Sequence, residues 1–176
     1  MIEAPRRLAP YLHAPLQSGS NRVLRRMGRH WYTAESYRGR LEWLAARLPV
    51  FGLGADVIAG FPGETDEDHQ ATRDLIYALP FTSLHVFPYS PRPDTAATRL
   101  RDAVAPGAIR VRAAELRTLG EERSVAYRAR RTGATADGVA SGRMAGQVDV
   151  LTEDYLSVHI PVEQWDGRPR FPVQVA

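Results

Sequence analysis

The stretch GLGADVIAGF, residues 52–61, places one carboxylate, Asp56, in an otherwise apolar run. A buried carboxylate without a partner is strongly unfavourable, so we expect Asp56 to have one. If the run is an extended strand, alternate residues share a face, and Asp56 then lies beside Gly54 and Gly60. Glycines on both sides leave space in front of the carboxylate for a ligand with hydroxyl groups or for a cation. A structural ion pair with a neighbouring arginine is the alternative.

The turn GFPGET, residues 60–65, leads from this strand toward a helix and offers Gly60, Gly63 and Glu64 as further candidate ligand contacts. In α/β folds, ligands bind at the carboxyl ends of parallel strands. A helix N-terminus ordinarily attracts anions, but the acidic side chains at positions 64 and 66–68 would repel a triphosphate. The turn therefore suits either a ligand with a positive centre or a well-capped helix start.

A similar junction occurs at PLQSGSN, residues 15–21, where Gln17 offers an amide and Ser18 a hydroxyl. Both are candidate ligand contacts, although Ser-Gly-Ser is also common turn chemistry. Arg29 follows soon after this junction. Its forked guanidinium could reach back over the strand ends to bind a carboxylate, unless it is an ordinary surface arginine.

Three prolines stiffen VFPYSPRPDT, residues 86–95. They hold Tyr89, Ser90 and Arg92 in an extended arrangement, which makes these side chains candidate substrate contacts. The same rigidity would also serve to close a barrel.

The elements that position these residues alternate between strands and helices. Strand-like runs occupy residues 11–17, 50–61 and 83–90. Between them, apolar residues recur at helical spacing after three capping side chains, Ser20, Thr33 and Thr65. Pro49 and Pro80 end the second and third helices. Strands separated in this way pair in parallel through right-handed crossovers, which predicts an α/β fold.

A long helix is expected from about Pro106, and RTGATADG, residues 131–138, interrupts the helical pattern. The runs GQVDVLTEDYLSVHIP and RFPVQVA beyond it predict a small antiparallel β module. We therefore expect three units, residues 1–104, 105–132 and 133–176.

The net charge is uneven along the chain. Residues 99–131 carry nine Arg and four acidic residues, a net charge of +5, whereas residues 132–176 carry three Arg and six acidic residues, a net charge of −3. The basic segment suits a polyanionic partner, and a solvated helix face explains it as well.

The chain has no cysteine, which excludes disulfides, thiolate nucleophiles and cysteine-ligated zinc or iron–sulfur clusters on this chain. All 23 basic residues are arginine, which excludes a phosphate-binding or Schiff-base lysine. The five histidines show no metal-ligand spacing, so we predict no metal ligand, and we assign no catalytic side chain. No apolar stretch approaches 18 residues and the N-terminus lacks the apolar run of a secretory signal, so we expect a cytoplasmic protein without a membrane segment.

Three ordered motifs, LHAPLQSGSNRVLRRMGRHWYT, ADVIAGFPGETDEDHQAT and LHVFPYSPRPDTAA, resemble the later half of the radical S-adenosylmethionine methylthiotransferases. That family attaches a methylthio group to a modified adenosine in tRNA or to a ribosomal protein. The segment LTEDYLSVHI is similar to the TRAM-type RNA-binding module of the family. The combination of LHVFPYSPRP with LTEDYL most resembles the branch that acts on N6-threonylcarbamoyladenosine beside the tRNA anticodon.

The resemblance implies the later half of a partial (βα) radical-enzyme barrel followed by a TRAM-like module. It implies S-adenosyl-L-methionine as cofactor and tRNA as partner. Gln17 and Asp56 would bind the ribose hydroxyls, and Arg29 would bind the methionyl carboxylate. The turn at residues 60–64 would flank the adenosine and methionine moieties.

The sequence also departs from the family pattern. The family holds its 4Fe–4S clusters with cysteines, one set in a CxxxCxxC loop, and this chain has none. We therefore expect that it corresponds to a carboxyl-terminal portion, that a cluster-bearing amino-terminal part is its partner, and that alone it performs no radical chemistry. Asp94 stands where the family usually has glycine.

The acidic balance of the last 45 residues leaves few groups for phosphate contacts in the β module, namely Arg143, Arg168 and Arg170. Two alternatives to the methylthiotransferase interpretation follow. One is a non-catalytic RNA-binding protein that uses the β module, and the other is a truncated product without independent function.

Overall fold

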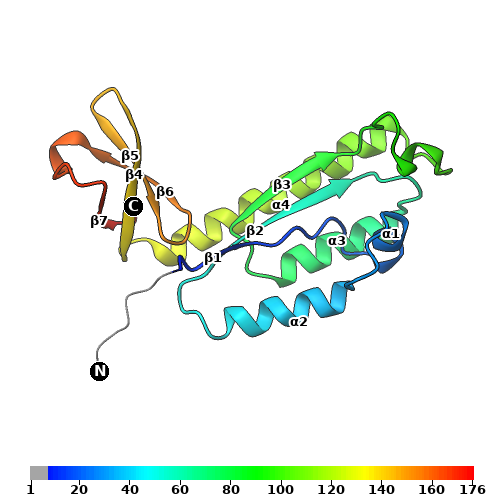
Figure 1. Cartoon of the computed structure of the whole chain (residues 1–176), viewed down its shortest axis with the longest axis horizontal. Coiled ribbons are helices and arrows are strands. Elements are labelled where there is room, and N and C mark those ends of the chain that lie inside the picture. Colours follow the sequence, from blue (N-terminus) through cyan, green and yellow to red (C-terminus); the bar gives the residue numbers. More distant parts are fainter. Residues whose placement is uncertain (1–7) are drawn as a thin grey trace.

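The computed structural model describes residues 8–176, so the first seven residues of the predicted 1–104 unit lie outside the described residues. The first part of the fold is a three-stranded parallel sheet in the order β1–β2–β3 (Figure 1). β1 spans Tyr11–His13, β2 spans Gly52–Ala59 and β3 spans Ser83–Pro88. The predicted parallel pairing is confirmed.

β1 is shorter than the predicted run 11–17. Pro15 has no N–H to donate to the ladder, and the chain pairs with β2 again only through an isolated bridge between Gln17 and Val57. The turn that carries Gln17 is thereby held against the middle of β2.

The α-helices of the described chain are α1 (Asn21–Arg26), α2 (Ala34–Ala45), α3 (Asp66–Ala78) and α4 (Pro106–Arg131), and a 3-10 turn, η1 (Ala96–Arg99), precedes α4. The predicted N-caps are confirmed, because the side chains of Ser20, Thr33 and Thr65 each accept a hydrogen bond from a backbone amide of the following helix. α2 ends before the predicted limit at Pro49.

The helices bury one face of the parallel sheet. On this face Val57 of β2 is fully buried and packs in one core with Leu41 of α2, Ile76 of α3 and Leu116 of α4. Because side chains alternate between the faces of a strand, Asp56 points the other way. Its side chain is 29% exposed.

The second part of the fold is an antiparallel sheet in the order β6–β5–β4–β7. Its strands are β4 (Thr135–Met144), β5 (Gln147–Thr152), β6 (Ser157–Pro161) and β7 (Arg170–Gln174), with a 3-10 turn, η2 (Val162–Gln164), before β7. The sheet has a hydrophobic core of its own, which includes Val148, Val150 and Phe171. The observed fold is therefore α/β with a parallel sheet followed by a small antiparallel β module, while a larger barrel around the parallel sheet stays a prediction.

α4 runs along the parallel sheet and ends beside the antiparallel sheet, so it connects the two parts (Figure 1). At its far end, Tyr127 packs in the core of the β module. Across residues 8–176, none of the helices combines the length and apolar character needed to cross a membrane.

Candidate cofactor-binding site

A pocket of about 400 Å³ lies toward the carboxyl ends of β2 and β3, the edge where parallel α/β sheets bind ligands. It is lined by Gln17 from the turn after β1, by Asp56 and Ile58 from β2, by Phe61, and by Tyr89, Ser90 and Arg92 from the segment after β3. Candidate cofactor contacts and candidate substrate contacts from the sequence analysis therefore meet in one place.

The backbone holds Gln17 beside Asp56. The Gln17 N–H donates to the Asp56 carbonyl oxygen at 2.8 Å, and the Ile58 N–H donates to the Gln17 carbonyl oxygen at 2.9 Å. Gln17 has a φ of 65°, in the left-handed region that few non-glycine residues occupy. Strained conformations of this kind cluster at functional sites.

The partners of Asp56 are two histidines. Its Oδ1 lies 3.2 Å from Nε2 of His13 and 3.2 Å from Nδ1 of His85. The register of the sheet creates this cluster, because His85 pairs with Asp56 and His13 pairs with Gly54. The ion pair with an arginine is not observed, since within residues 8–176 no arginine lies within 4 Å of this carboxylate.

The turn after β2 is organised around the buried carboxylate of Glu64. It accepts a hydrogen bond from the Gly60 N–H at 3.0 Å and pairs with Nη1 of Arg112 at 2.9 Å. Burial raises the pKa of Glu64, although the Gly60 N–H and Arg112 favour the ionised form. Glu64 thus ties the turn to α4, and it is not among the residues that line the pocket.

Two glycines give this turn its shape. Gly60 and Gly63 have φ values of 79° and 82°, which favour glycine. A β-carbon at Gly60 would meet Ile109 of α4, and one at Gly63 would meet the guanidinium of Arg26. Neither glycine is among the residues that line the pocket.

Two acidic side chains in the first turn of α3 form ion pairs with arginines of this chain. Asp68 forms a capping box with Thr65, accepts a 2.6 Å hydrogen bond from Ser20 and pairs with Arg22. Asp66 pairs with Nη2 of Arg112 at 2.6 Å. Of the two sequence interpretations, these contacts support a well-capped helix start over a ligand with a positive centre.

Ser18 and Arg29 do not line the pocket. Ser18 is buried, where its Oγ lies 3.4 Å from Oγ1 of Thr72 and accepts a hydrogen bond from the Ser20 N–H. The guanidinium of Arg29 lies over the ring of Trp31, 5.3 Å from its centroid. Among the described residues, Arg92 is the arginine that lines the pocket.

The segment after β3 forms part of the pocket wall. The Tyr89 N–H donates to the Ala59 carbonyl oxygen at 2.8 Å, and the Tyr89 ring packs edge-on against Phe61. Asp94 has a φ of 63°, so the backbone at this position is indeed left-handed, as the glycine of the family pattern would allow.

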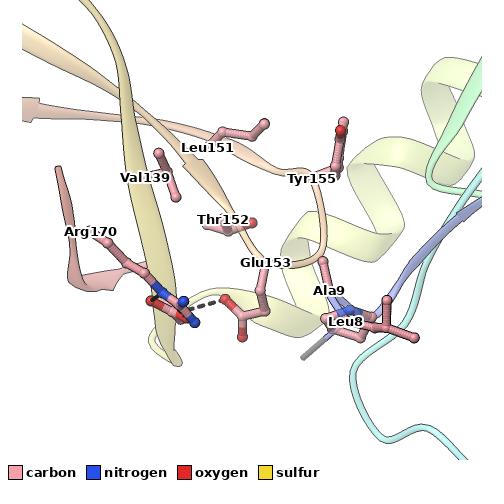
Figure 2. Close-up of a pocket in the computed structure, with 10 residues that line it drawn as sticks. Leu8, Ala9, Val139, Leu151, Thr152, Glu153, Tyr155 and Arg170 are labelled. Atoms are coloured by element: carbon pink, nitrogen blue, oxygen red, sulfur yellow. Dashed lines mark hydrogen bonds and ion pairs between the residues drawn. The ribbon is translucent and has the colours of Figure 1, made fainter. Parts of the chain in front are cut away.

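A second pocket, of about 350 Å³, lies between the start of the described chain and the β module (Figure 2). Its charged side chains already form ion pairs or hydrogen bonds with other residues of the chain. Arg170 binds Asp137, and Glu153 accepts a 2.6 Å hydrogen bond from the Asp137 N–H. This pocket therefore offers fewer free polar groups than the one at Asp56.

The basic segment 99–131 exposes less charge than its composition indicates. Arg112 and Arg131 are buried and pair with acidic groups, Glu64 and Asp154 among them. Exposed arginines remain at positions 99, 101, 110, 117 and 130. Most of the charge available to a polyanion lies on these five residues, because Arg123 and Arg128 are half-buried.

No family model matches this chain. It is 38% identical over 176 residues to the tRNA-2-methylthio-N(6)-dimethylallyladenosine synthase of Clavibacter michiganensis, covering 97% of this chain and 33% of the relative. It is 41% identical over 155 residues to the threonylcarbamoyladenosine tRNA methylthiotransferase of Treponema pallidum, covering 88% of this chain and 31% of the relative. The chain spans about a third of the length of these relatives. Its homologues are thus tRNA methylthiotransferases of two substrate types, and the similarity does not single out the threonylcarbamoyladenosine type.

Proposed function

We propose that this chain is the carboxyl-terminal part of a tRNA methylthiotransferase and that the pocket at Asp56 is its share of the S-adenosyl-L-methionine site. The observation that carries the proposal is the convergence of Gln17, Asp56 and Arg92 on one pocket from three segments. An amide and a carboxylate suit ribose hydroxyls, and a guanidinium suits a carboxylate. The names of the homologues support the reaction class.

The side chains present fit this cofactor in their chemistry. Asp56 and Gln17 would bind the ribose hydroxyls, and Phe61 with Tyr89 offers an aromatic surface for the base. Arg29 would have to leave Trp31 to bind the methionyl carboxylate, whereas Arg92 already lines the pocket. When bound, S-adenosyl-L-methionine supplies the radical chemistry of the family. The cysteines of the 4Fe–4S clusters would come from the amino-terminal part of the enzyme, since this chain has none.

The proposed substrate is tRNA, and the proposed nucleoside is N6-threonylcarbamoyladenosine next to the anticodon. The motifs LHVFPYSPRP and LTEDYL favour this branch, and the relative from Treponema pallidum is named for that specificity. Deletion of the gene, followed by mass spectrometry of tRNA nucleosides, tests the choice. We expect the deletion strain to lose the 2-methylthio group from N6-threonylcarbamoyladenosine. If it instead lost this group only from dimethylallyladenosine, the other substrate type would be assigned.

A non-catalytic RNA-binding protein is the second candidate. It is favoured by the absence of cysteine together with the five exposed arginines of residues 99–130. Such a protein would use the α/β part as a scaffold and would not bind S-adenosyl-L-methionine.

Isothermal titration of the 176-residue chain with S-adenosyl-L-methionine separates the two candidates. We expect Asp56→Ala to weaken binding roughly tenfold or more, because it removes a charged hydrogen-bond acceptor. Asp149→Ala is the matched control, since Asp149 is also bonded to a histidine but lies in the β module. No binding by the wild-type chain would leave the RNA-binding candidate. Equal affinities of wild type and Asp56→Ala would show that the cofactor does not bind at Asp56 and would overturn the proposed site.

A further inference from the structure

We propose that His13, Asp56 and His85 form a binding site for a divalent transition metal ion. One ligand atom from each residue lies within 4.8 Å of the other two. Oδ1 of Asp56 is central, at 3.2 Å from both Nε2 of His13 and Nδ1 of His85. These residues come from β1, β2 and β3, so each strand of the parallel sheet contributes one ligand.

The spacing suits coordination. Nitrogen and oxygen ligands bind zinc at about 2.0–2.2 Å, so two ligands of a tetrahedral ion lie about 3.3–3.6 Å apart. The two carboxylate-to-imidazole distances of 3.2 Å are close to this separation. The two imidazole rings lie 5.4 Å apart between centroids and are tilted by 36°, so small side-chain rotations bring both nitrogens around one ion.

The register of the strands positions the three ligand side chains. Parallel register places His85 opposite Asp56, and it places His13 opposite Gly54, two residues earlier on the same face. A β-carbon at Gly54 would lie 2.8 Å from Nδ1 of His13, so glycine leaves the space that this ring fills. Ligands carried on strands of one sheet are held more rigidly than ligands on loops.

The chemistry of the set also points to a metal. Two imidazoles and one carboxylate bind divalent zinc, cobalt, nickel or iron and leave further coordination positions open. The side chains of His13, Asp56 and His85 are 31%, 29% and 62% exposed, so an ion can enter from solvent. Within residues 8–176, no guanidinium lies within 4 Å of Asp56 to compete for its charge.

The same contacts have a second explanation, in which both imidazoles donate N–H hydrogen bonds to Asp56 and only orient its carboxylate. Zinc titration distinguishes the two. Asp56 also lines the proposed cofactor pocket. The metal proposal does not rest on the proposed function, because the three ligands can bind an ion whether or not a cofactor occupies that pocket.

The experiment uses the untagged, metal-stripped 176-residue chain, titrated with ZnCl₂ by calorimetry and with CoCl₂ by visible absorption. We expect one ion per chain. His13→Gln, His85→Gln and Asp56→Asn should each weaken zinc binding roughly tenfold or more, because each removes one of three ligands. Because His85 is the most exposed of the three ligands, His85→Gln should disturb folding least. Far-UV circular dichroism checks that each variant is folded.

His159→Gln is the matched control, because His159 Nδ1 lies 2.7 Å from Asp149 in a cluster of only two ligands. It should leave zinc affinity unchanged. Absence of stoichiometric binding, or equal loss in His159→Gln and His85→Gln, would overturn the site. The two proposals fail separately. Zinc binding tests the metal site, whereas S-adenosyl-L-methionine binding tests the proposed function, and His85→Gln should retain cofactor binding while Asp56→Ala should lose it.

Discussion

The hydroxyl of Tyr127 in α4 donates a 2.6 Å hydrogen bond to the carboxylate of Asp154, which is completely buried in the β module. Nε of Arg131 donates to the same oxygen at 2.8 Å, and Thr152 donates to the other oxygen at 2.6 Å. Burial alone would raise the pKa of Asp154, but these three donors hold it below its ordinary value. The network fixes the end of α4 to the turn between β5 and β6.

This network predicts that Tyr127→Phe destabilises the chain by about 1–2 kcal/mol, since a buried carboxylate loses one donor while Arg131 and Thr152 remain. Urea unfolding at pH 7 measures the loss. Tyr77→Phe is the control, because Tyr77 is 69% exposed and its hydroxyl makes no hydrogen bond within residues 8–176. Equal stability of the two variants would show that the Tyr127 hydroxyl contributes nothing.

Asp68 makes the stability of the fold depend on acid pH. Burial would raise its pKa, but hydrogen bonds from Arg22, Ser20 and Thr65 lower it from 3.8 to about 2. A group with a lowered folded-state pKa stabilises the protein above its unfolded pKa, and this stabilisation is lost as the pH falls through the folded pKa. The contribution should therefore be complete above about pH 4 and absent below about pH 2.

We expect Asp68→Asn to lower the free energy of unfolding at pH 7 by about 1–2 kcal/mol. The difference from wild type should shrink between pH 4 and pH 2, as measured by urea unfolding across this range. Asp74→Asn changes an exposed carboxylate of the same helix and should match wild type. If the difference in the free energy of unfolding between Asp68→Asn and wild type did not change with pH, the ionised carboxylate of Asp68 would not be the source of the stabilisation.

Local sequence signals were sufficient for much of the fold. The caps Ser20, Thr33 and Thr65 lie next to the helices that they begin, and a capping side chain acts over only three residues. Alternating strands and helices predicted the parallel sheet because crossover connections leave few other topologies. Gln17 and Asp56 were predicted as neighbours through the family resemblance, and the bridge between Gln17 and Val57 accounts for their proximity.

The contacts that sequence reasoning missed join residues far apart in the chain. His13 and His85 meet Asp56 only through the register of three strands, and their sequence spacing resembles no metal motif. One signal was present, because each histidine follows a leucine near the start of a strand-like run. Arg112 was counted as available charge, yet it is buried against Glu64, 48 residues away.

Asp94 provides a test of backbone strain beside the pocket. Its φ of 63° is unfavourable for a residue with a β-carbon, although aspartate tolerates it better than most. We expect Asp94→Gly to raise the free energy of unfolding by about 0.5–1 kcal/mol and Asp94→Ala to lower it. Urea unfolding of both variants gives the comparison, and a less stable Asp94→Gly would show that the aspartate side chain compensates for its conformation.

The exposed arginines of α4 give the final prediction, which concerns tRNA binding. Arg110 and Arg117 are exposed, and no carboxylate of the described chain lies within 4 Å of either guanidinium, so both can contact phosphates. The double variant Arg110→Gln/Arg117→Gln should weaken tRNA binding roughly three- to tenfold at moderate salt and reduce the slope of log affinity against log salt by about 1–2. Filter binding at several salt concentrations measures both quantities.

The double variant Arg38→Gln/Arg47→Gln, with Arg38 on α2 and Arg47 just after it, changes the net charge equally and is the control. Arg38 already pairs with Glu42 at 2.7 Å and Arg47 lies over the ring of Trp43. If tRNA is bound by charge in general, both double variants will weaken it equally. If α4 is the contact surface, only Arg110→Gln/Arg117→Gln will reduce the salt slope, because only that variant removes phosphate contacts and the counterion release that accompanies them.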